Sequence, residues 1–253
     1  MFTLLAIILG GIWGSFANVC IHRLPINQSV VVKRSYCPSC KNNIKWFDNL
    51  PLLSFVVLGG KCRKCKKKIN LQYFIVELLS ILSFVTIYYI FGLTITSLLL
   101  AILIIYFIII FFIDLKHFII PDILTFPLMV IGFIKSFDPY LNTSIFPNYI
   151  NSLFGGIFGY LIIWSIILFY KKVRKKEGMG LGDAKLLAAV GFWFGWISIP
   201  FVLLISSLVA LLYVAPSLIK KSKNLTSEIP FGPYIILGVI LFVTFQQKFN
   251  FLL

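Results

Sequence analysis

The sequence predicts an all-α polytopic membrane protein with about eight transmembrane helices. Of the 253 residues, 60% are hydrophobic and 12% are charged, whereas about a quarter of the residues in a soluble domain are charged. Long apolar runs alternate with polar segments, and a membrane-spanning helix needs roughly 20 apolar residues. Residues 2–21 lack a preceding basic segment and a small-residue cleavage site, so we interpret this run as a span and not as a signal peptide.

The eight predicted spans follow one another along most of the chain. Residues 71–113 are too long for one helix, and Gly92 marks a break between spans two and three. A second break near Pro200 divides residues 183–219 into spans six and seven. The other predicted spans are residues 2–21, 119–134, 149–170 and 229–247. Spans four, six and seven are short, so the orientation is better determined than the number of spans.

The distribution of Lys and Arg predicts the orientation of the spans. Residues 22–70 form a polar segment with eleven Lys or Arg, and the net charge of the chain is +15. If this segment is cytoplasmic, the loops on its side of the membrane carry twenty basic residues, against Lys135 and Lys248 on the other side. Basic residues gather in cytoplasmic loops of membrane proteins. We therefore expect both termini to lie outside the cytoplasm.

A glycine-rich segment, residues 178–185, precedes the sixth predicted span. Gly178, Gly180 and Gly182 give a backbone that can take positive φ and that another segment can approach closely. Asp183 follows these glycines, and Asp114 ends the third span at the same predicted depth. Ionisable residues at the ends of membrane spans are candidate functional residues, because their burial is costly. Each aspartate could instead cap a helix.

Two neighbouring carboxylates suit acid–base hydrolysis of a peptide bond, because like charges close together leave one of them protonated. The ionised aspartate can take a proton from water while the protonated one donates to the scissile carbonyl. Asp183 should lie near the positive end of a helix and Asp114 near a negative end. This difference predicts Asp183 as the principal base and Asp114 as the principal acid.

Two CxxC pairs in the polar segment predict a structural zinc site. Cys37 and Cys40 form one pair, Cys62 and Cys65 form the other, and an Ile follows each pair after three residues. This local repeat indicates two knuckles that close one tetrahedral site with four thiolate ligands and no open position. A redox or disulfide role is the alternative. Cys20, within the first span, is interpreted as a small buried apolar residue.

Four further polar residues are candidates for shaping a site. Asn18 in the first span could bond a neighbouring helix or belong to a site. Glu77 lies in the second span and needs a partner, which could be a Lys or Arg of residues 22–70, the polar segment that holds the two cysteine pairs and is called the cysteine segment below. Asp122 follows Pro121, and we favour a helix N-cap over a site role for it; Lys185 begins the sixth span.

The chain resembles the type IV prepilin peptidases over nearly its whole length, through motifs that occur in the same order. The motifs are Gly14-Ser15-Phe16-Ala17-Asn18-Val19, Arg23-Leu24-Pro25, the two cysteine pairs, Asn49-Leu50-Pro51-Leu52-Leu53-Ser54, Ile113-Asp114, Ile120-Pro121-Asp122, residues 178–189 and Ile229-Pro230-Phe231-Gly232-Pro233. The resemblance implies a membrane aspartic peptidase of bacteria with Asp114 and Asp183 as the catalytic pair. It would remove the basic leader of type IV prepilins and pseudopilins at the cytoplasmic face of the inner membrane.

The resemblance also implies methylation of the new N-terminal amine with S-adenosylmethionine. The four-cysteine segment accompanies the bifunctional members of that family. No G-x-G-x-x-G motif follows a strand pattern, so methylation rests on the resemblance alone and the S-adenosylmethionine pocket is not located. In this interpretation residues 1–21 are the first helix, 22–70 the cytoplasmic zinc loop and 71–253 a seven-helix peptidase core.

Two other functions remain open from the sequence. The chain could be a peptidase without methyltransferase activity, or a zinc-stabilised membrane scaffold of a pilus or secretion machine. The basic run 61–68 is similar to a nucleic-acid-binding zinc knuckle. Because Lys clusters next to a span usually meet anionic lipids, we expect membrane lipids and no nucleic acid as its partner.

Overall fold

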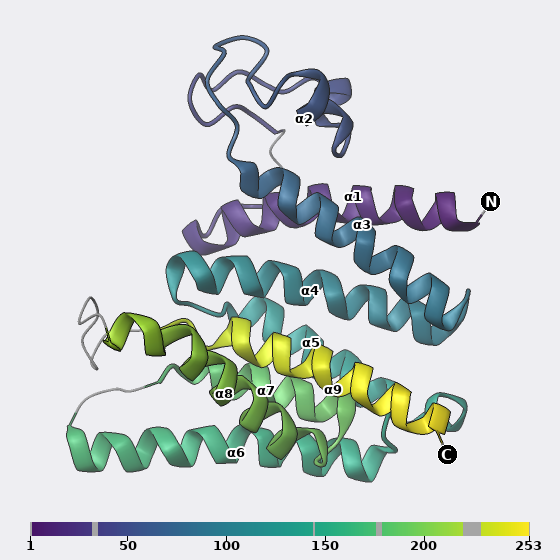
Figure 1. Cartoon of the computed structure of the whole chain (residues 1–253), viewed down its shortest axis with the longest axis vertical. Coiled ribbons are helices and arrows are strands. Elements are labelled where there is room, and N and C mark those ends of the chain that lie inside the picture. The colour runs from purple at the N-terminus through teal and green to yellow at the C-terminus, as the bar shows by residue number, and fades with distance from the viewer. Residues whose placement is uncertain (1, 32–34, 144, 176–178, 220–228, 253) are drawn as a thin grey trace. The chain divides into compact units, whose positions relative to one another are not determined.

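The computed structural model describes residues 2–31, 35–143, 145–175, 179–219 and 229–252. These residues form helices joined by loops, and the β pairing among them consists of two isolated bridges within the cysteine segment (Figure 1). The prediction of an all-α fold is therefore confirmed.

A helix of 14 residues or more coincides with each of the eight predicted apolar runs. The helices are α1 (Phe2–Arg23), α3 (Leu71–Phe91), α4 (Ile95–His117), α5 (Asp122–Lys135), α6 (Tyr149–Arg174), α7 (Leu181–Phe194), α8 (Ser198–Ile219) and α9 (Gly232–Leu252). The short helix α2 (Leu53–Val57) lies in the cysteine segment and was not predicted. The 3₁₀ turns are Leu24–Ile26, Trp46–Asn49 and Pro139–Leu141.

Five of the described helices, α1, α3, α4, α6 and α8, are long and apolar enough to cross a membrane. Helices α5 and α7 have 14 residues each, which at 1.5 Å per residue is about 21 Å and less than a hydrocarbon core of about 30 Å. The presence of several spans is thus supported, and their total of eight stays a prediction.

Both predicted breaks occur, and glycines with positive φ stand at them. Gly92 has a φ of 64° and follows the last residue of α3. The Thr94 hydroxyl accepts a hydrogen bond from the Ser97 amide at 3.2 Å, and the Thr94 amide donates to the Ser97 hydroxyl at 3.1 Å. Gly195, with a φ of 78°, ends α7 three residues before α8 begins. Positive φ is accessible to glycine at little cost, which allows these sharp stops.

The chain divides into two compact units, residues 1–109 and residues 110–253. In the first unit α1 packs directly on α3. A Cβ atom added to Gly10 would lie 2.8 Å from Ile81 Cα, and one added to Gly14 would lie 2.9 Å from Glu77 Cα. The Ser80 hydroxyl donates to the Gly10 carbonyl at 2.7 Å. Small residues and a buried hydroxyl therefore bring the two backbones together, as is usual for membrane helices.

In the second unit α7 is surrounded by other helices. Ten of its 14 residues are buried, and it packs against α5 and α6, while α8 packs against α9. The fully buried Trp193 donates its indole N–H to the Leu128 carbonyl of α5 at 2.8 Å, and Ser152 of α6 donates to the Phe192 carbonyl at 2.7 Å. A short apolar helix of this kind is typical of a protein core. The apolar sequence of α7 is therefore explained by its burial among the other helices of the unit.

Candidate active site

The two aspartates of the predicted pair lie in the same unit at the ends of two helices. Asp114 is in the last turn of α4 and Asp183 is in the first turn of α7. Helix α4 stops at His117 because Phe118 takes a left-handed conformation with a φ of 56°. The exposed fractions of the two residues are only 4% and 8%, and the charge of Asp114 acts on Asp183. The structure therefore brings the two carboxylates near each other.

Sequence reasoning missed the backbone group that holds Asp114. The amide N–H of Gly232 donates a hydrogen bond to Asp114 Oδ2 at 2.9 Å. Gly232 is the first residue of α9, so its amide belongs to the positive end of that helix. The signal in the sequence was Pro230-Phe231-Gly232-Pro233, which begins the last apolar run. A Pro just after the first helical residue is common at helix N-termini.

The described glycines of the glycine-rich segment do not have positive φ, but one of them allows a neighbouring segment to pack closely against the backbone. Gly180 has a φ of −80°, and Gly182 lies within α7 and is absent from the positive-φ residues, so that expectation was wrong for both. A Cβ atom added to Gly182 would lie 3.0 Å from Ile120 Cβ, which confirms the expected close approach. Gly178 lies outside the described residues.

Ile120 also limits the space at the Gly232 side of the pair. A Cβ atom added to Gly232 would lie 2.8 Å from Asp114 Oδ2 and 3.1 Å from Ile120 Cδ1. Ile120 thus contacts both Gly182 and Gly232, in the segment that joins α4 to α5. The two glycines allow three segments distant in sequence to meet around the aspartates.

Asp122 does not cap α5. The N-cap residue is Pro121, and no side chain caps this helix end; Asp122 is already the first helical residue. Its carboxylate instead forms an ion pair with Lys185 of α7, with 2.6 Å between Nζ and Oδ1. The Lys185 ammonium also lies 5.4 Å from the centre of the Phe126 ring. The N-cap interpretation of Asp122 was therefore wrong. Asp122 and Lys185, both predicted as residues that could shape a site, contact each other instead.

Asn18 and Glu77 belong to the first unit. The Asn18 amide donates to the Tyr73 carbonyl of α3 at 3.0 Å, which confirms the expected bond to a neighbouring helix. A Lys or Arg of the cysteine segment was the expected partner of Glu77, but among the described residues its carboxylate bonds to other groups. Its Oε2 accepts a hydrogen bond from the amide N–H of Leu52 at 2.9 Å. The Ser15 hydroxyl donates a second hydrogen bond to the Glu77 carboxylate.

The Leu52 backbone that Glu77 holds is strained. Its φ of 58° and ψ of −46° are rare for a residue with a side chain. The Leu53 amide donates to the Pro51 carbonyl at 2.6 Å, which closes a three-residue γ-turn. Residues 49–54, one of the motifs noted in the sequence, therefore form a turn that is fixed by a carboxylate of α3.

The four cysteines of the two CxxC pairs come together. Their Sγ atoms all lie within 4.8 Å of one another, and Cys37 Sγ is 3.9 Å from Cys65 Sγ. Four sulfurs around one zinc ion, each about 2.3 Å away, would be about 3.8 Å apart. The donor set fits a tetrahedral zinc site with no open position. Cys20, by contrast, is buried in α1 as expected.

The two knuckles repeat the same backbone pattern 25 residues apart. The Cys37 amide donates to the Asn42 carbonyl and the Cys62 amide to the Lys67 carbonyl, both at 2.9 Å. Lys41 and Lys66 both take left-handed φ values, 56° and 57°. The repeat seen in the sequence thus corresponds to two equivalent turns. Hydrogen bonds from Asn42 lower the pKa of Cys40 to about 6, and backbone hydrogen bonds from Cys65 and Lys64 lower the pKa of Cys62. Burial and the neighbouring thiols raise the pKa of Cys65 to about 11, so the cluster holds both easily ionised and less easily ionised thiols before a metal binds.

An ion pair joins the 3₁₀ turn Trp46–Asn49, which follows the first knuckle, to the second knuckle. Arg63 donates to both oxygens of Asp48, with 2.7 Å between Nη2 and Oδ1. The Arg63 guanidinium holds the pKa of the Asp48 carboxyl below its usual range. The Phe47 ring lies 5.5 Å from the same guanidinium. This contact helps to close the loop around the cysteines.

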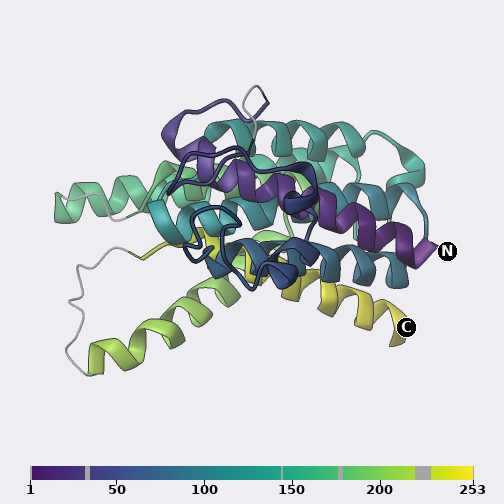
Figure 2. The same ribbon diagram turned by 90° about the horizontal axis from the view of Figure 1, so that it is seen from above.

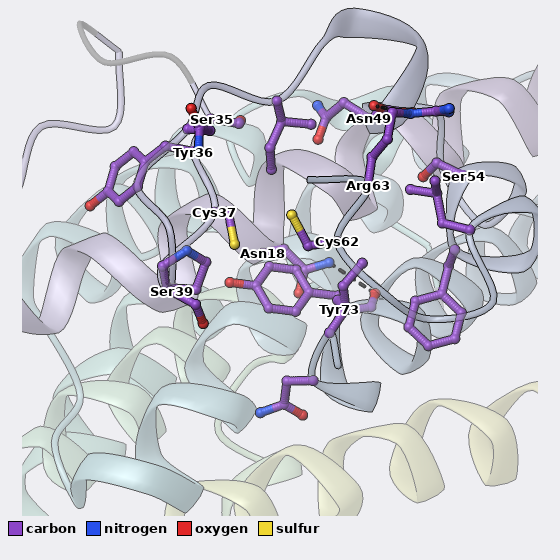
Figure 3. Close-up of a pocket in the computed structure, with 18 of the residues that line it drawn as sticks. Asn18, Ser35, Tyr36, Cys37, Ser39, Asn49, Ser54, Cys62, Arg63 and Tyr73 are labelled. Carbon is purple, nitrogen blue, oxygen red and sulfur yellow. Dashed lines mark hydrogen bonds and ion pairs between the residues drawn. The ribbon is translucent and has the colours of Figure 1, made fainter. Parts of the chain in front are cut away.

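A pocket of about 720 Å³ lies within the first unit. Its walls come from the second half of α1, the cysteine segment and the first two turns of α3. Figure 2 looks down on the cysteine segment where it lies over these two helices. Figure 3 shows Asn18 hydrogen-bonded to Tyr73 at the pocket wall, with the Cys37 and Cys62 side chains next to them. The aspartate pair is not among its lining residues.

The fold and these two centres define a helical membrane protein with a buried aspartate pair in one unit and a four-thiol centre in the other. Family models match both the N-terminal part and the remaining helical part of the chain. Residues 8–91 match the bacterial peptidase A24 N-terminal domain, and residues 100–215 match the type IV leader peptidase family. The chain belongs to the type IV leader peptidase family.

Relatives in several bacteria match over nearly the full length. The prepilin leader peptidase/N-methyltransferase of Pseudomonas aeruginosa is 35% identical over 94% of this chain and 88% of its own. The protein of the same name from Vibrio cholerae serotype O1 is 34% identical over 95% of this chain and 94% of its own. That of Aeromonas salmonicida is 35% identical over 89% of this chain and 84% of its own. No solved structure matches the chain.

Proposed function

We propose that this protein cleaves the leader peptide from type IV prepilins and pseudopilins and methylates the new N-terminal amine with S-adenosylmethionine. The observation that carries the peptidase half is the meeting of Asp114 and Asp183, both buried, at the ends of helices α4 and α7. The names of the relatives support both halves.

In this mechanism the two carboxylates share one proton. The ionised aspartate takes a proton from a water molecule, and the resulting hydroxide attacks the scissile carbonyl carbon. The protonated aspartate donates to the carbonyl oxygen, which gives a neutral tetrahedral intermediate. The intermediate collapses as the C–N bond breaks: the aspartate that took the proton from water gives it to the leaving nitrogen, and one hydroxyl of the intermediate returns its proton to the other, now ionised, aspartate. Water and peptide are converted to a carboxylic acid and an amine without a covalent intermediate.

The hydrogen bond from Gly232 supports a different division of roles from the one that the sequence predicts. The helix-end effects that assign the base role to Asp183 are worth about 0.3–1 kcal/mol each. A hydrogen bond to a charged group contributes about 1.5–3 kcal/mol. Asp114 receives one at 2.9 Å from the first amide of α9; the Gly180 backbone also favours ionised Asp183, but without a hydrogen bond of ordinary geometry from it to the Asp183 carboxylate in the described part of the chain. We therefore propose Asp114 as the ionised base and Asp183 as the acid in the resting pair, whose titration belongs to both groups.

The cysteine segment is proposed as a structural zinc loop. The four sulfurs would be the ligands, and the metal would fix the fold of residues 35–70 without an open position for chemistry. We further propose that this loop and the aspartate pair lie at the cytoplasmic face of the inner membrane, with both termini outside. The concentration of Lys and Arg in the corresponding loops supports this orientation, and anionic lipids would be their partners.

A direct assay tests both activities and the alternatives. Membranes that contain the protein are incubated with a prepilin, and loss of the leader is followed on a gel. Labelled S-adenosylmethionine in the same reaction reports methylation. Cleavage without methylation would identify a peptidase alone. A scaffold would leave the prepilin intact, and Asp114→Asn would then not affect pilus assembly.

A further inference from the structure

The pocket in the first unit has no part in the aspartate chemistry. All its lining residues lie between Ser15 and Glu77, whereas Asp114 and Asp183 belong to the second unit. Its volume of about 720 Å³ lies within the range of about 300–1,000 Å³ that is typical of small-molecule and cofactor sites. The structural zinc centre does not need such a space, because its four sulfurs already surround the metal position.

The lining of the pocket combines apolar and aromatic surfaces with polar groups. Phe55 and Leu58 come from the region of α2, and Tyr73 and Phe74 from α3. Phe55 and Phe74 pack on each other with 5.2 Å between ring centres. Asparagine side chains and cationic side chains complete the wall, among them Asn43, Asn49 and Arg63. Such a surface suits a ligand with a flat heterocycle, hydroxyl groups and charges of both signs.

Glu77 is the acidic group of this wall that α3 supplies. The groups that interact with it in the described part of the chain are neutral, namely the Leu52 amide and the Ser15 hydroxyl. Removal of a carboxylate from water is unfavourable unless a cation or strong donors compensate it. A ligand with a positive charge would therefore be held better at this position than a neutral ligand.

We propose that this pocket binds S-adenosylmethionine, with the sulfonium group next to the Glu77 carboxylate; the proposal rests on the methyltransferase half of the function proposed above. A sulfonium has no N–H or O–H donor and is surrounded by carbon atoms, so it needs negative charge nearby and apolar contact. An ammonium group would need several acceptors instead. Glu77 already accepts from Leu52, and Phe74, three residues before it on α3, lines the same pocket, which favours the sulfonium.

The test compares the charged donor with its neutral product. S-adenosylhomocysteine keeps every part of the molecule except the methyl group and the positive charge on sulfur. Binding of labelled S-adenosylmethionine and of S-adenosylhomocysteine to the purified, zinc-loaded full-length protein is measured at equilibrium. We expect Glu77→Gln to weaken S-adenosylmethionine binding by about tenfold. The affinity for S-adenosylhomocysteine should change less than about twofold, because a thioether carries no charge.

Two controls separate the pocket from the fold and from the peptidase. The glutamine oxygen can still accept the Leu52 amide, so zinc content and thermal stability of Glu77→Gln should match the unaltered protein. Asp114→Asn removes a charge in the second unit and should leave both affinities unchanged. Equal weakening of both ligands, or no weakening, would overturn the assignment of Glu77 to the sulfonium.

Photo-crosslinking locates the ligand without relying on activity. Irradiation with labelled S-adenosylmethionine should attach the label to residues 15–77, and excess S-adenosylhomocysteine should prevent it. Attachment to residues of the second unit would overturn the pocket assignment while the proposed activities stand. Intact leader cleavage with no S-adenosylmethionine binding would reject both the pocket and the methyltransferase half, and would leave the peptidase half in place.

Discussion

The first unit supplies its four thiols from turns of a loop, whereas the second unit supplies its two carboxylates from the ends of packed helices. In the loop, the residues around Cys37 and Cys62 are held by local backbone hydrogen bonds and have little apolar support. In the second unit, Asp114 and Asp183 are buried among helices that make a continuous core. The zinc centre should therefore depend on its metal, and the aspartate pair on helix packing.

This difference predicts that the two units can be damaged separately. A change at the aspartates should remove one activity and leave the other unit folded. A change at the cysteines should unfold a loop and leave the helices of the second unit in place. The following predictions test this separation, from the largest expected effect to the smallest.

Replacement of either aspartate should abolish cleavage. Asp114→Asn and Asp183→Asn each remove one member of an acid–base pair, and we expect the rate of leader removal to fall by at least about 10²–10⁴-fold. The measurement is the rate of prepilin cleavage by purified variants at equal concentration. Methylation of a precleaved pilin should continue in both variants. Normal cleavage by either variant would contradict the assignment of the pair.

Loss of the zinc centre should affect methylation more than cleavage. We expect one zinc ion per chain, bound by Cys37, Cys40, Cys62 and Cys65, and Cys62→Ser should release it and unfold the loop, because metal binding drives folding in such small units. Metal analysis and the two activities are the measurements. Cys20→Ser, a change at a buried cysteine outside the cluster, is the matched control and should keep the zinc. Stoichiometric disulfides in a metal-free protein would disprove the zinc site.

The two described glycines of the glycine-rich segment should differ in their tolerance of a methyl group. An added Cβ at Gly182 would press on Ile120 at 3.0 Å, whereas at Gly180 the nearest atom is Asp183 Oδ2, at an ordinary 3.7 Å. Gly182→Ala should therefore lower the cleavage rate by about tenfold or more, since overpacking costs about 1–3 kcal/mol. Gly180→Ala, the matched control, should stay within about threefold, because no close contact is made. Equal rates for the two variants would show that the contact with Ile120 does not hold the site.

The ion pair between Asp122 and Lys185 should have a small effect. Because both side chains are partly exposed, the pair should contribute about 0.2–1 kcal/mol, which limits the loss of cleavage to about fivefold. Asp122→Asn, Lys185→Met and the double variant form a thermodynamic cycle. The double variant should be no worse than the poorer single variant. Fully additive losses would show that the two residues act independently.

The location of the shared proton is the finest test. We expect infrared difference spectra at the pH of maximal activity to show a protonated-carboxyl band in Asp114→Asn, from Asp183, and none in Asp183→Asn. The Gly232 hydrogen bond is the reason, because it stabilises ionised Asp114 by about 1.5–3 kcal/mol. The reverse pattern would restore the assignment that follows from the helix ends of α4 and α7 alone.

The sequence alone determined the apolar runs, both breaks between helices, the four-cysteine repeat and the two aspartates. These features are local, because a run of apolar residues, a glycine at a helix end or a CxxC turn has the same meaning wherever it lies in the fold. The resemblance to the type IV prepilin peptidases also came from local motifs in a fixed order. The family comparison then confirmed it.

Only the tertiary structure decided which groups meet across long distances in the chain. Gly232 is far from Asp114 in sequence, Lys185 is far from Asp122, and the Leu52 amide is the partner of Glu77 where a cation was expected. Each of these contacts depends on how helices pack, and packing follows from the shape complementarity of whole surfaces. For the same reason, the sequence could not show that the apolar run of α7 is buried in protein, or that a pocket forms where α1, α3 and the cysteine segment come together.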